Sequence, residues 1–305
     1  MKIEISRPYS FCQLGKRDNQ EDARFPDEDM PAGCAPVFVV CDGVGGRDKG
    51  EVASRLVADT LGEYVASRDL SRGLDSEDLS AALGHVYRRF ERNLTPDTRE
   101  MATTMTLVAF HRRGVLCSHM GDSRIYHVRP GVGILYRSDD HSLVNALVHS
   151  GNLTPEEAID HPRSNVITRS IGYVEPGDER PAATTLQISD VEPGDYFFLC
   201  TDGVVNRLGD DELLEILSSS RPDREKMELI ASRSRLGSDN NTAFLVGVAS
   251  VERESFDDFD DAMSSDDSSS STAPIDRPDF RSQEVTPLGG SQGGKLSRFF
   301  KSLFH

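Results

Sequence analysis

Several acidic side chains of this chain stand where an apolar run ends and the backbone must turn. Four aspartates share this setting: Asp42 in FVVCDGVGG, Asp122 in SHMGDSR, Asp202 in FFLCTDG and Asp239 in GSDNNT. Taken singly, each is ordinary turn chemistry, because Asp–Gly and Asp–Asn pairs favour tight turns. Recurrence changes this interpretation, since carboxylates gathered at strand ends repel one another unless a cation holds them. Oxygen ligands without clustered Cys or His suit Mg²⁺ or Mn²⁺ better than zinc, so the pattern predicts a binuclear site for hard divalent ions.

A further acidic pair lies near the N-terminus. Glu21 and Asp22 follow Arg17 in GKRDNQEDA, directly after the first candidate strand. These two acids join the four aspartates as candidates for the same site.

The elements that would position these acids form a mixed αβ pattern up to about Val251. Strand-like runs are predicted at 104–111, 115–120, 124–128, 196–200 and 242–250, and amphipathic helices at 51–68 and 76–94. The first three strands follow one another with only short turns between them, which favours antiparallel hairpins over a helix-linked parallel sheet. The helices cluster instead of alternating with the strands.

Composition excludes several classes of function. The formal net charge is -17 and the pI is about 4.9, so the concentrated basic surface that a nucleic acid requires is not expected. No apolar run suits a signal peptide or a membrane span, so we expect a cytoplasmic protein. The five cysteines show no C-x-x-C spacing, which favours reduced and mostly buried thiols over disulfides or zinc.

Beyond residue 252 the character of the chain changes. Residues 253–294 are acidic, rich in serine and poor in large apolar side chains, so we expect a disordered linker. Residues 295–305, KLSRFFKSLFH, place four apolar side chains on one helical face: Leu296, Phe299, Phe300 and Leu303. This basic amphipathic segment is predicted to dock on an anionic membrane surface or in a partner groove, and chance periodicity in a disordered terminus is the alternative.

Eight segments together resemble one known family. In order, they are RDNQEDA, VCDGVGGRDKGEVAS, MATTMT, GDSRIY, SDDHSLVNALVHSG, NVITRSIG, LCTDGV and SDNNTAFLV. Their order and approximate spacing resemble the metal-dependent protein phosphatases, the type 2C serine/threonine family, from about Ser10 to Val248. The resemblance implies an α+β fold, a four-layer αββα sandwich of two antiparallel β-sheets flanked by helices. It sets a catalytic domain at residues 1–252.

The resemblance also implies roles for individual residues. Asp42 would bridge two metals, the Gly43 carbonyl would bind one of them, and Asp202 and Asp239 would complete the other. Glu21 and Asp22 match acids that hold metal-bound waters. The remaining correspondences are Asp122, which with Asp202 would bind a third metal seen in bacterial members, and Arg17, which would bind the substrate phosphate.

The activity implied is hydrolysis of phosphoserine and phosphothreonine in proteins by water that two Mn²⁺ or Mg²⁺ ions activate, with a third ion in addition. The partners implied are phosphoproteins, including a bacterial serine/threonine kinase that the enzyme opposes. We expect a monomer. Residues 139–172 resemble the mobile flap beside the family's active site, which is expected to shape substrate choice.

One departure from the family pattern concerns the proton donor to the leaving group. Many eukaryotic members carry a histidine after the first Asp–Gly motif, whereas this chain has Val44. His119 and a metal-bound water are the candidate donors, although a histidine within an apolar run is more often a core residue. His141 is expected to order a loop.

Three other functions share some of these sequence features. A phosphate-cradling nucleotide loop is disfavoured because G-K-[ST] is absent and G-x-G-x-x-G spacing fails at Asp48. A two-metal nuclease would use the same carboxylates but needs a basic approach surface. A pseudophosphatase that binds phosphoproteins as a regulatory scaffold is the remaining alternative, and the presence of Asp42, Asp202 and Asp239 favours catalysis over it.

Overall fold

The computed structural model describes residues 1–27, 35–44, 49–93, 95, 99–159, 161–175 and 177–253. Within these residues the helices are α1 (Gly50–Ala66), α2 (Ser76–Arg92), α3 (Leu143–His149), α4 (Pro155–Ile159), α5 (Asp202–Val205), α6 (Asp210–Ser218) and α7 (Asp223–Ser234). The linker predicted at 253–294 and the amphipathic segment predicted at 295–305 lie outside the described residues, apart from Arg253.

The strands form two antiparallel sheets. One has the order β1-β13-β12-β8-β9, with β2 also paired to β13, and contains β1 (Lys2–Ile5), β2 (Tyr9–Gln13), β8 (Arg124–Arg129), β9 (Gly133–Arg137), β12 (Tyr196–Cys200) and β13 (Asn241–Glu252). The other has the order β10-β5-β4-β6-β7-β11, with β3 also paired to β4, and contains β3 (Asp22–Phe25), β4 (Val37–Val44), β5 (Ala102–Thr103), β6 (Met105–His111), β7 (Gly114–Met120), β10 (Ile171–Gly172) and β11 (Thr184–Ile188).

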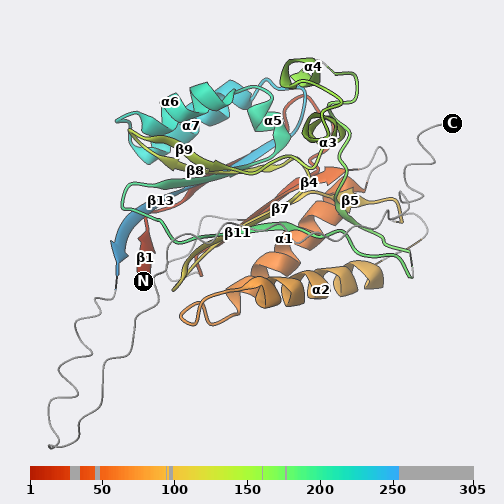
Figure 1. The fold of residues 1–305 in the computed structure, drawn as a ribbon, viewed down its shortest axis with the longest axis horizontal. Coiled ribbons are helices and arrows are strands. Elements are labelled where there is room, and N and C mark those ends of the chain that lie inside the picture. The colour runs from red at the N-terminus through yellow and green to blue at the C-terminus, as the bar shows by residue number, and fades with distance from the viewer. Residues whose placement is uncertain are drawn as a thin grey trace, which may run out of the picture. The chain divides into compact units, whose positions relative to one another are not determined.

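Three apolar cores hold these sheets and helices in four layers. Helices α1 and α2 cover the outer face of the sheet that contains β4, and α5, α6 and α7 cover the outer face of the sheet that contains β12 (Figure 1). The core between the sheets includes Phe38, Phe110, Phe197 and Phe244. The predicted αββα sandwich is therefore confirmed.

Alternation along β4 explains how a core strand can deliver a carboxylate. Val37, Val39 and Cys41 pack toward the helices, whereas Phe38 and Val40 pack between the sheets. Side chains on a strand alternate between its two faces, so Asp42 continues the series of Phe38 and Val40 at the point where the core between the sheets ends.

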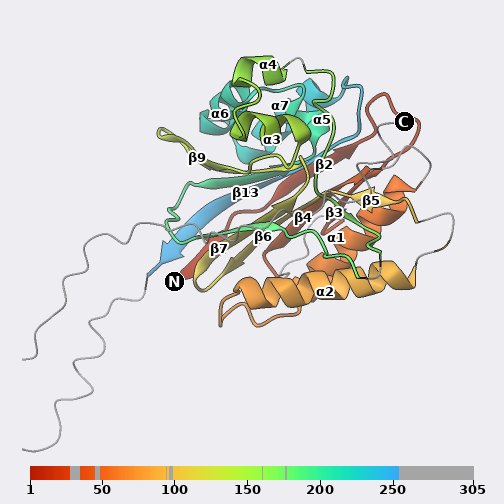
Figure 2. The same ribbon diagram turned by 45° about the vertical axis from the view of Figure 1, so that its right-hand side comes forward.

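Helix α1 packs closely against the sheet because of one glycine. A Cβ added at Gly62 would lie 2.1 Å from the Phe25 ring, so a larger residue would force the helix away from β3. Helix α1 passes beside β3 and β4 (Figure 2), and its first residue, Gly50, lies next to the end of β4. The same packing therefore holds α1 against the strands that carry Asp22 and Asp42.

The described helices contain none that is both long and apolar enough to cross a bilayer.

Candidate metal centre

Asp22 and Asp42 face each other across the β3–β4 pair. Asp22 is buried, and its Oδ2 accepts a hydrogen bond of 2.9 Å from the Thr201 hydroxyl. Its Oδ1 is buried and has no hydrogen-bond partner among the described residues. Burial, together with the negative charges of Asp202 and Asp239, raises the pKa of Asp22 to about 8. The carboxyl group therefore lacks a full set of partners within the described part of the chain.

Asp42 is held at its place by the backbone. Its N–H donates to the Thr104 hydroxyl at 2.9 Å, and its carbonyl accepts from the Thr104 N–H and the Thr103 hydroxyl, both at 2.8 Å. Burial raises the pKa of the Asp42 carboxyl well above its usual value, and Asp22, Asp202 and the other site aspartates raise it further. A fixed acid surrounded by acids is an environment that favours a bound cation.

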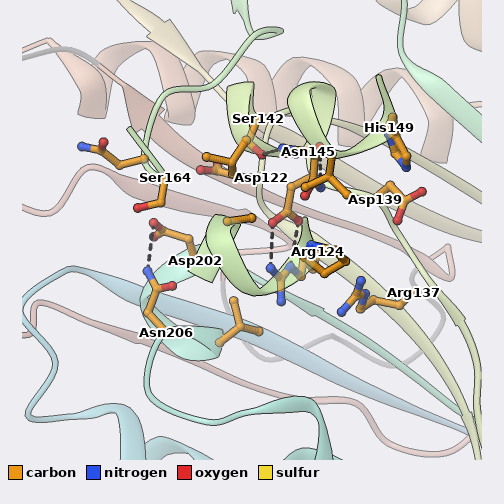
Figure 3. Close-up of a pocket in the computed structure, with 17 residues that line it drawn as sticks. Asp122, Arg124, Arg137, Asp139, Ser142, Asn145, His149, Ser164, Asp202 and Asn206 are labelled. Atoms are coloured by element: carbon orange, nitrogen blue, oxygen red, sulfur yellow. Dashed lines mark hydrogen bonds and ion pairs between the residues drawn. The ribbon is translucent and has the colours of Figure 1, made fainter. Parts of the chain in front are cut away.

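Asp202 lies where β12 ends and α5 begins. Its Oδ2 accepts a hydrogen bond of 3.2 Å from the Asn206 amide (Figure 3), and its Oδ1 is buried with no hydrogen-bond partner among the described residues. Burial and the charge of Asp239 raise the pKa of Asp202. Asp122, in the turn between β7 and β8, has a pKa raised to about 7 by burial and by Asp202 and Asp140.

Asp239 and Arg17 meet across two loops. The Arg17 Nη2 atom lies 2.7 Å from Asp239 Oδ2, and Asp239 Oδ1 accepts from the Asn240 N–H at 2.9 Å. The two loops touch because Gly15 has φ +63° and a Cβ there would lie 2.0 Å from the Asp239 carbonyl oxygen. The Arg17 side chain remains 54% exposed, so the guanidinium can be reached from solvent while it pairs with Asp239.

Glu21 and Gly43 lie together beside the start of α1. The Gly43 N–H donates to the Glu21 carbonyl at 3.0 Å. A Cβ added at Gly50 would lie 2.9 Å from the Glu21 carboxyl carbon and 3.0 Å from the Gly43 carbonyl oxygen. The structure thus brings the two oxygen donors predicted near Asp42 to one place.

The donor chemistry fits Mn²⁺ or Mg²⁺. All the candidate ligands are oxygens, and two buried carboxylate oxygens, on Asp22 and Asp202, lack any partner in the described part of the chain. Within that part, no three Asp, Glu, His or Cys side chains already converge as a complete ligand set.

The sequence did not indicate the residues that support this centre. Asn240 accepts from the Glu21 N–H at 2.8 Å and donates to the carbonyls of Leu14 and Asn19 at 2.8 and 3.0 Å. Its hydrogen bonds connect the loop that contains Arg17 to the loop before β13 that contains Asp239. The available signal was the polar run SDNNT directly before a strand, but its partners lie more than 200 residues away in the chain.

His119 is part of the interior. Its side chain is buried, its Nε2 lies 2.8 Å from the Asp139 carbonyl oxygen, and its ring stacks on His141 with centroids 4.5 Å apart. Burial lowers the pKa of His119, which favours the neutral ring. His141 accepts from the Gly121 N–H at 3.2 Å and its carbonyl accepts from the Thr168 N–H at 2.6 Å. These contacts place both rings in the support of the loops around Asp122.

Comparison with known proteins identifies the family to which this centre belongs. The profile of the family described as protein phosphatase 2C matches residues 20–233. The chain belongs to the protein phosphatase 2C family. Protein phosphatase PhpP of Streptococcus pneumoniae is 30% identical over 243 residues, which cover 78% of this chain and 96% of that protein.

Solved structures of related phosphatases share the fold. Serine/threonine phosphatase Stp1 from Staphylococcus aureus matches with a TM-score of 0.67 and 26% identity over 83% of this chain and 96% of that one. The catalytic domain of the serine/threonine protein phosphatase PstP, in complex with 2 manganese ions, matches with a TM-score of 0.63 and 28% identity over 80% and 99% of the two chains.

The protein is therefore a protein phosphatase 2C-type serine/threonine phosphatase, a metal-dependent hydrolase. This confirms the predicted activity. Nothing in the comparisons supports the alternative of a pseudophosphatase scaffold.

Proposed function

We propose that the acids at this edge of the sandwich form the binuclear centre of the phosphatase. Asp42 and the Gly43 carbonyl would hold the ions together with Asp202 and Asp239. The observation that carries this proposal is the pair of buried carboxylate oxygens, one on Asp22 and one on Asp202, that have no partner among the described residues, with the pKa of Asp22 at about 8. Glu21 and Asp22 hold the water around the ions, and Asp22 is oriented for this by the Thr201 hydroxyl.

When bound, two such ions supply positive charge that lowers the pKa of water and stabilises phosphate oxygens during an in-line displacement. Arg17 binds the phosphate of the substrate. Its guanidinium has five N–H donors, and the Nη2 contact with Asp239 leaves others for phosphate oxygens. Asp239 therefore both completes the centre and orients the guanidinium toward it.

A third ion is proposed at Asp122 and Asp202. Both carboxylates line one pocket, and the pKa of each is raised by burial and a neighbouring acid. Such a pair gains from a shared cation by removal of its mutual repulsion.

The wider role proposed is opposition to a serine/threonine kinase by a monomeric enzyme whose catalytic domain spans residues 1–252. The proposed linker at 253–294 and docking segment at Lys295 to His305 would place this domain near a membrane surface or a partner. Deletion of Lys295 to His305 is expected to leave peptide hydrolysis unchanged. Co-sedimentation with anionic liposomes and cell fractionation test whether location changes.

The activity test is release of phosphate from phosphothreonine, phosphoserine and phosphotyrosine peptides with Mn²⁺, with Mg²⁺ and with excess chelator. The proposal predicts metal-dependent release from the first two peptides and loss of release in chelator. Asp42→Ala is the matched variant and should lose activity with every metal. Full activity in excess EDTA, or a near-normal Asp42→Ala enzyme, would overturn the proposed centre.

A further inference from the structure

A pocket of about 500 Å³ opens beside the proposed centre, between α3, α4 and the start of α5. Asp122 and Asp202 line it, so the pocket is continuous with the carboxylates that hold the metal ions in the proposed function. Figure 3 shows Asp202 and Asn206 on one side of this pocket and Arg137 and Asp139 on the other. A peptide whose phosphate lies at the centre would therefore extend a neighbouring side chain toward Asp139.

The two arginines of the pocket already have acidic partners. Arg124 donates from Nε and Nη2 to the two oxygens of Asp140, both at 2.7 Å. Arg137 donates to Asp210 at 2.6 Å. Their charges are thus largely neutralised within the chain. Asp122 and Asp202 would be neutralised by the proposed ions, which leaves Asp139 as the acid of the lining without a counter-charge among the described residues.

Asp139 differs from the other acids of the pocket. Its side chain is exposed, and its carboxylate makes no hydrogen bond or ion pair with any described residue. Its main chain is fixed, because its carbonyl accepts from the buried His119 ring at 2.8 Å and the adjacent Ser138 exchanges two hydrogen bonds of 2.9 Å with Ile125. A carboxylate held at one place and still lacking a partner is preorganised to bind a cation from outside the chain.

We infer that this pocket binds a basic side chain of the phosphoprotein near its phosphorylated residue, and that Asp139 is a specificity-determining residue that selects it. The inference rests on the proposed function, which places a third ion at Asp122 and Asp202 on the edge of this pocket and the substrate phosphate at the neighbouring binuclear centre. Lysine and arginine both satisfy it, since their stems can lie along the pocket while the charged head reaches the carboxylate. An acidic side chain at the same place would be repelled by the Asp139 carboxylate.

The test uses a set of phosphothreonine peptides that differ only in one residue, lysine, norleucine or glutamate, placed in turn at each of the three positions on either side of the phosphothreonine. The measured quantity is kcat/KM with Mn²⁺. At one or more positions the lysine peptide should exceed the norleucine peptide by about 3- to 10-fold, the range of a partly shielded charge pair. In Asp139→Asn this ratio should fall to about 1, and in Asp139→Glu it should persist.

Asp211→Asn is the control, because Asp211 is exposed on α6 and does not line the pocket. It should keep the lysine preference of the wild type. No lysine preference at any position, a preference that survives in Asp139→Asn, or a preference for glutamate would each overturn the inference. If the norleucine peptide is hydrolysed with metal but charge has no effect, only this inference fails; if no peptide is hydrolysed, the proposed function fails.

Discussion

Each end of β12 carries an aspartate, buried Asp195 before the strand and half-buried Asp202 after it, and the two carboxylates have different surroundings. Asp195, just before the strand, accepts from His127 Nε2 at 2.9 Å, from Arg129 at 2.8 and 3.0 Å, and from the Glu192 N–H at 2.9 Å. Asp202, just after the strand, accepts one long hydrogen bond and has an oxygen with no described partner. Hydrogen bonds from His127 and Arg129 outweigh burial and lower the pKa of Asp195, whereas burial raises that of Asp202.

This difference separates a structural carboxylate from one that requires an external cation. A buried charge is tolerated when hydrogen bonds and an opposite charge offset its desolvation. At Asp195 these partners come from the chain. At Asp202 the described residues do not supply them, and Asp42, Asp122 and Asp239, which interact with it, have the same sign of charge.

The largest expected effect is the loss of catalysis when Asp202 is replaced. Asp202→Asn keeps the shape of the side chain but removes the charge that a divalent ion requires, so kcat should fall by about 10³-fold or more. Asp195→Asn should change kcat by less than about threefold. Steady-state hydrolysis of a phosphothreonine peptide in saturating Mn²⁺ measures both. Equal losses in the two variants would remove the distinction between the ends.

At the other end the expected effect is on stability. Asp195→Ala leaves His127 and Arg129 without their shared carboxylate in a buried setting, so the free energy of unfolding should drop by about 3 to 5 kcal/mol. Urea unfolding in chelator measures this drop. Asp202→Asn under the same conditions should not destabilise the protein, because it removes a repelling charge. A stable Asp195→Ala protein would show that the network contributes little.

Arg17 tests whether the exposed side of the centre binds phosphate. Arg17→Ala should lower kcat/KM by a factor that corresponds to about 2 to 4 kcal/mol of transition-state stabilisation. Much of the change should appear in KM, since the guanidinium contacts the substrate already in the ground state. Affinity for Mn²⁺, measured by calorimetry, should barely change. A large loss of metal affinity would mean that the ion pair with Asp239 organises the ligands instead.

Dependence on pH gives the smallest effect. The pKa values of Asp22 and Asp122 are about 8 and about 7 in the fold, against about 3.9 in an unfolded chain. The folded state therefore holds protons that the unfolded state has lost, and this stabilising contribution disappears as pH rises through 7 to 8. Metal-free protein should lose about 1 kcal/mol of unfolding free energy between pH 7 and 8.5, measured in urea. A rise in stability over this range would contradict the assignment.

The helices and strands could be predicted from the sequence because they follow local patterns, whereas the αββα sandwich was implied by the family resemblance. The helix predicted at 51–68 is Gly50–Ala66, and the one predicted at 76–94 is Ser76–Arg92. Strand alternation and the turn after each apolar run likewise indicated Asp42 and Asp202. These features depend on residues that are close neighbours in the chain.

Contacts between distant segments could not be predicted in the same way. Asn240 bonds to Glu21 across 219 residues, and Thr201 bonds to Asp22 across 179. The same holds for cysteines: Cys41, Cys117 and Cys200 are buried as expected, but Cys12 lies exposed on β2, and Cys34 lies outside the described residues. Side-chain partners and exposure depend on how sheets and loops meet, which local sequence does not specify.

Asp195, at one end of β12, is neutralised by hydrogen bonds from the chain, whereas Asp202, at the other end, and its neighbour Asp42 require divalent cations. The most direct measurement is the free energy of unfolding in urea as a function of Mn²⁺ concentration, for the wild type, Asp42→Asn and Asp195→Asn. A ligand that binds only the folded state stabilises it progressively above its dissociation constant. We predict that Mn²⁺ stabilises the wild type and Asp195→Asn by similar amounts and Asp42→Asn much less. Equal stabilisation of all three proteins would contradict the account.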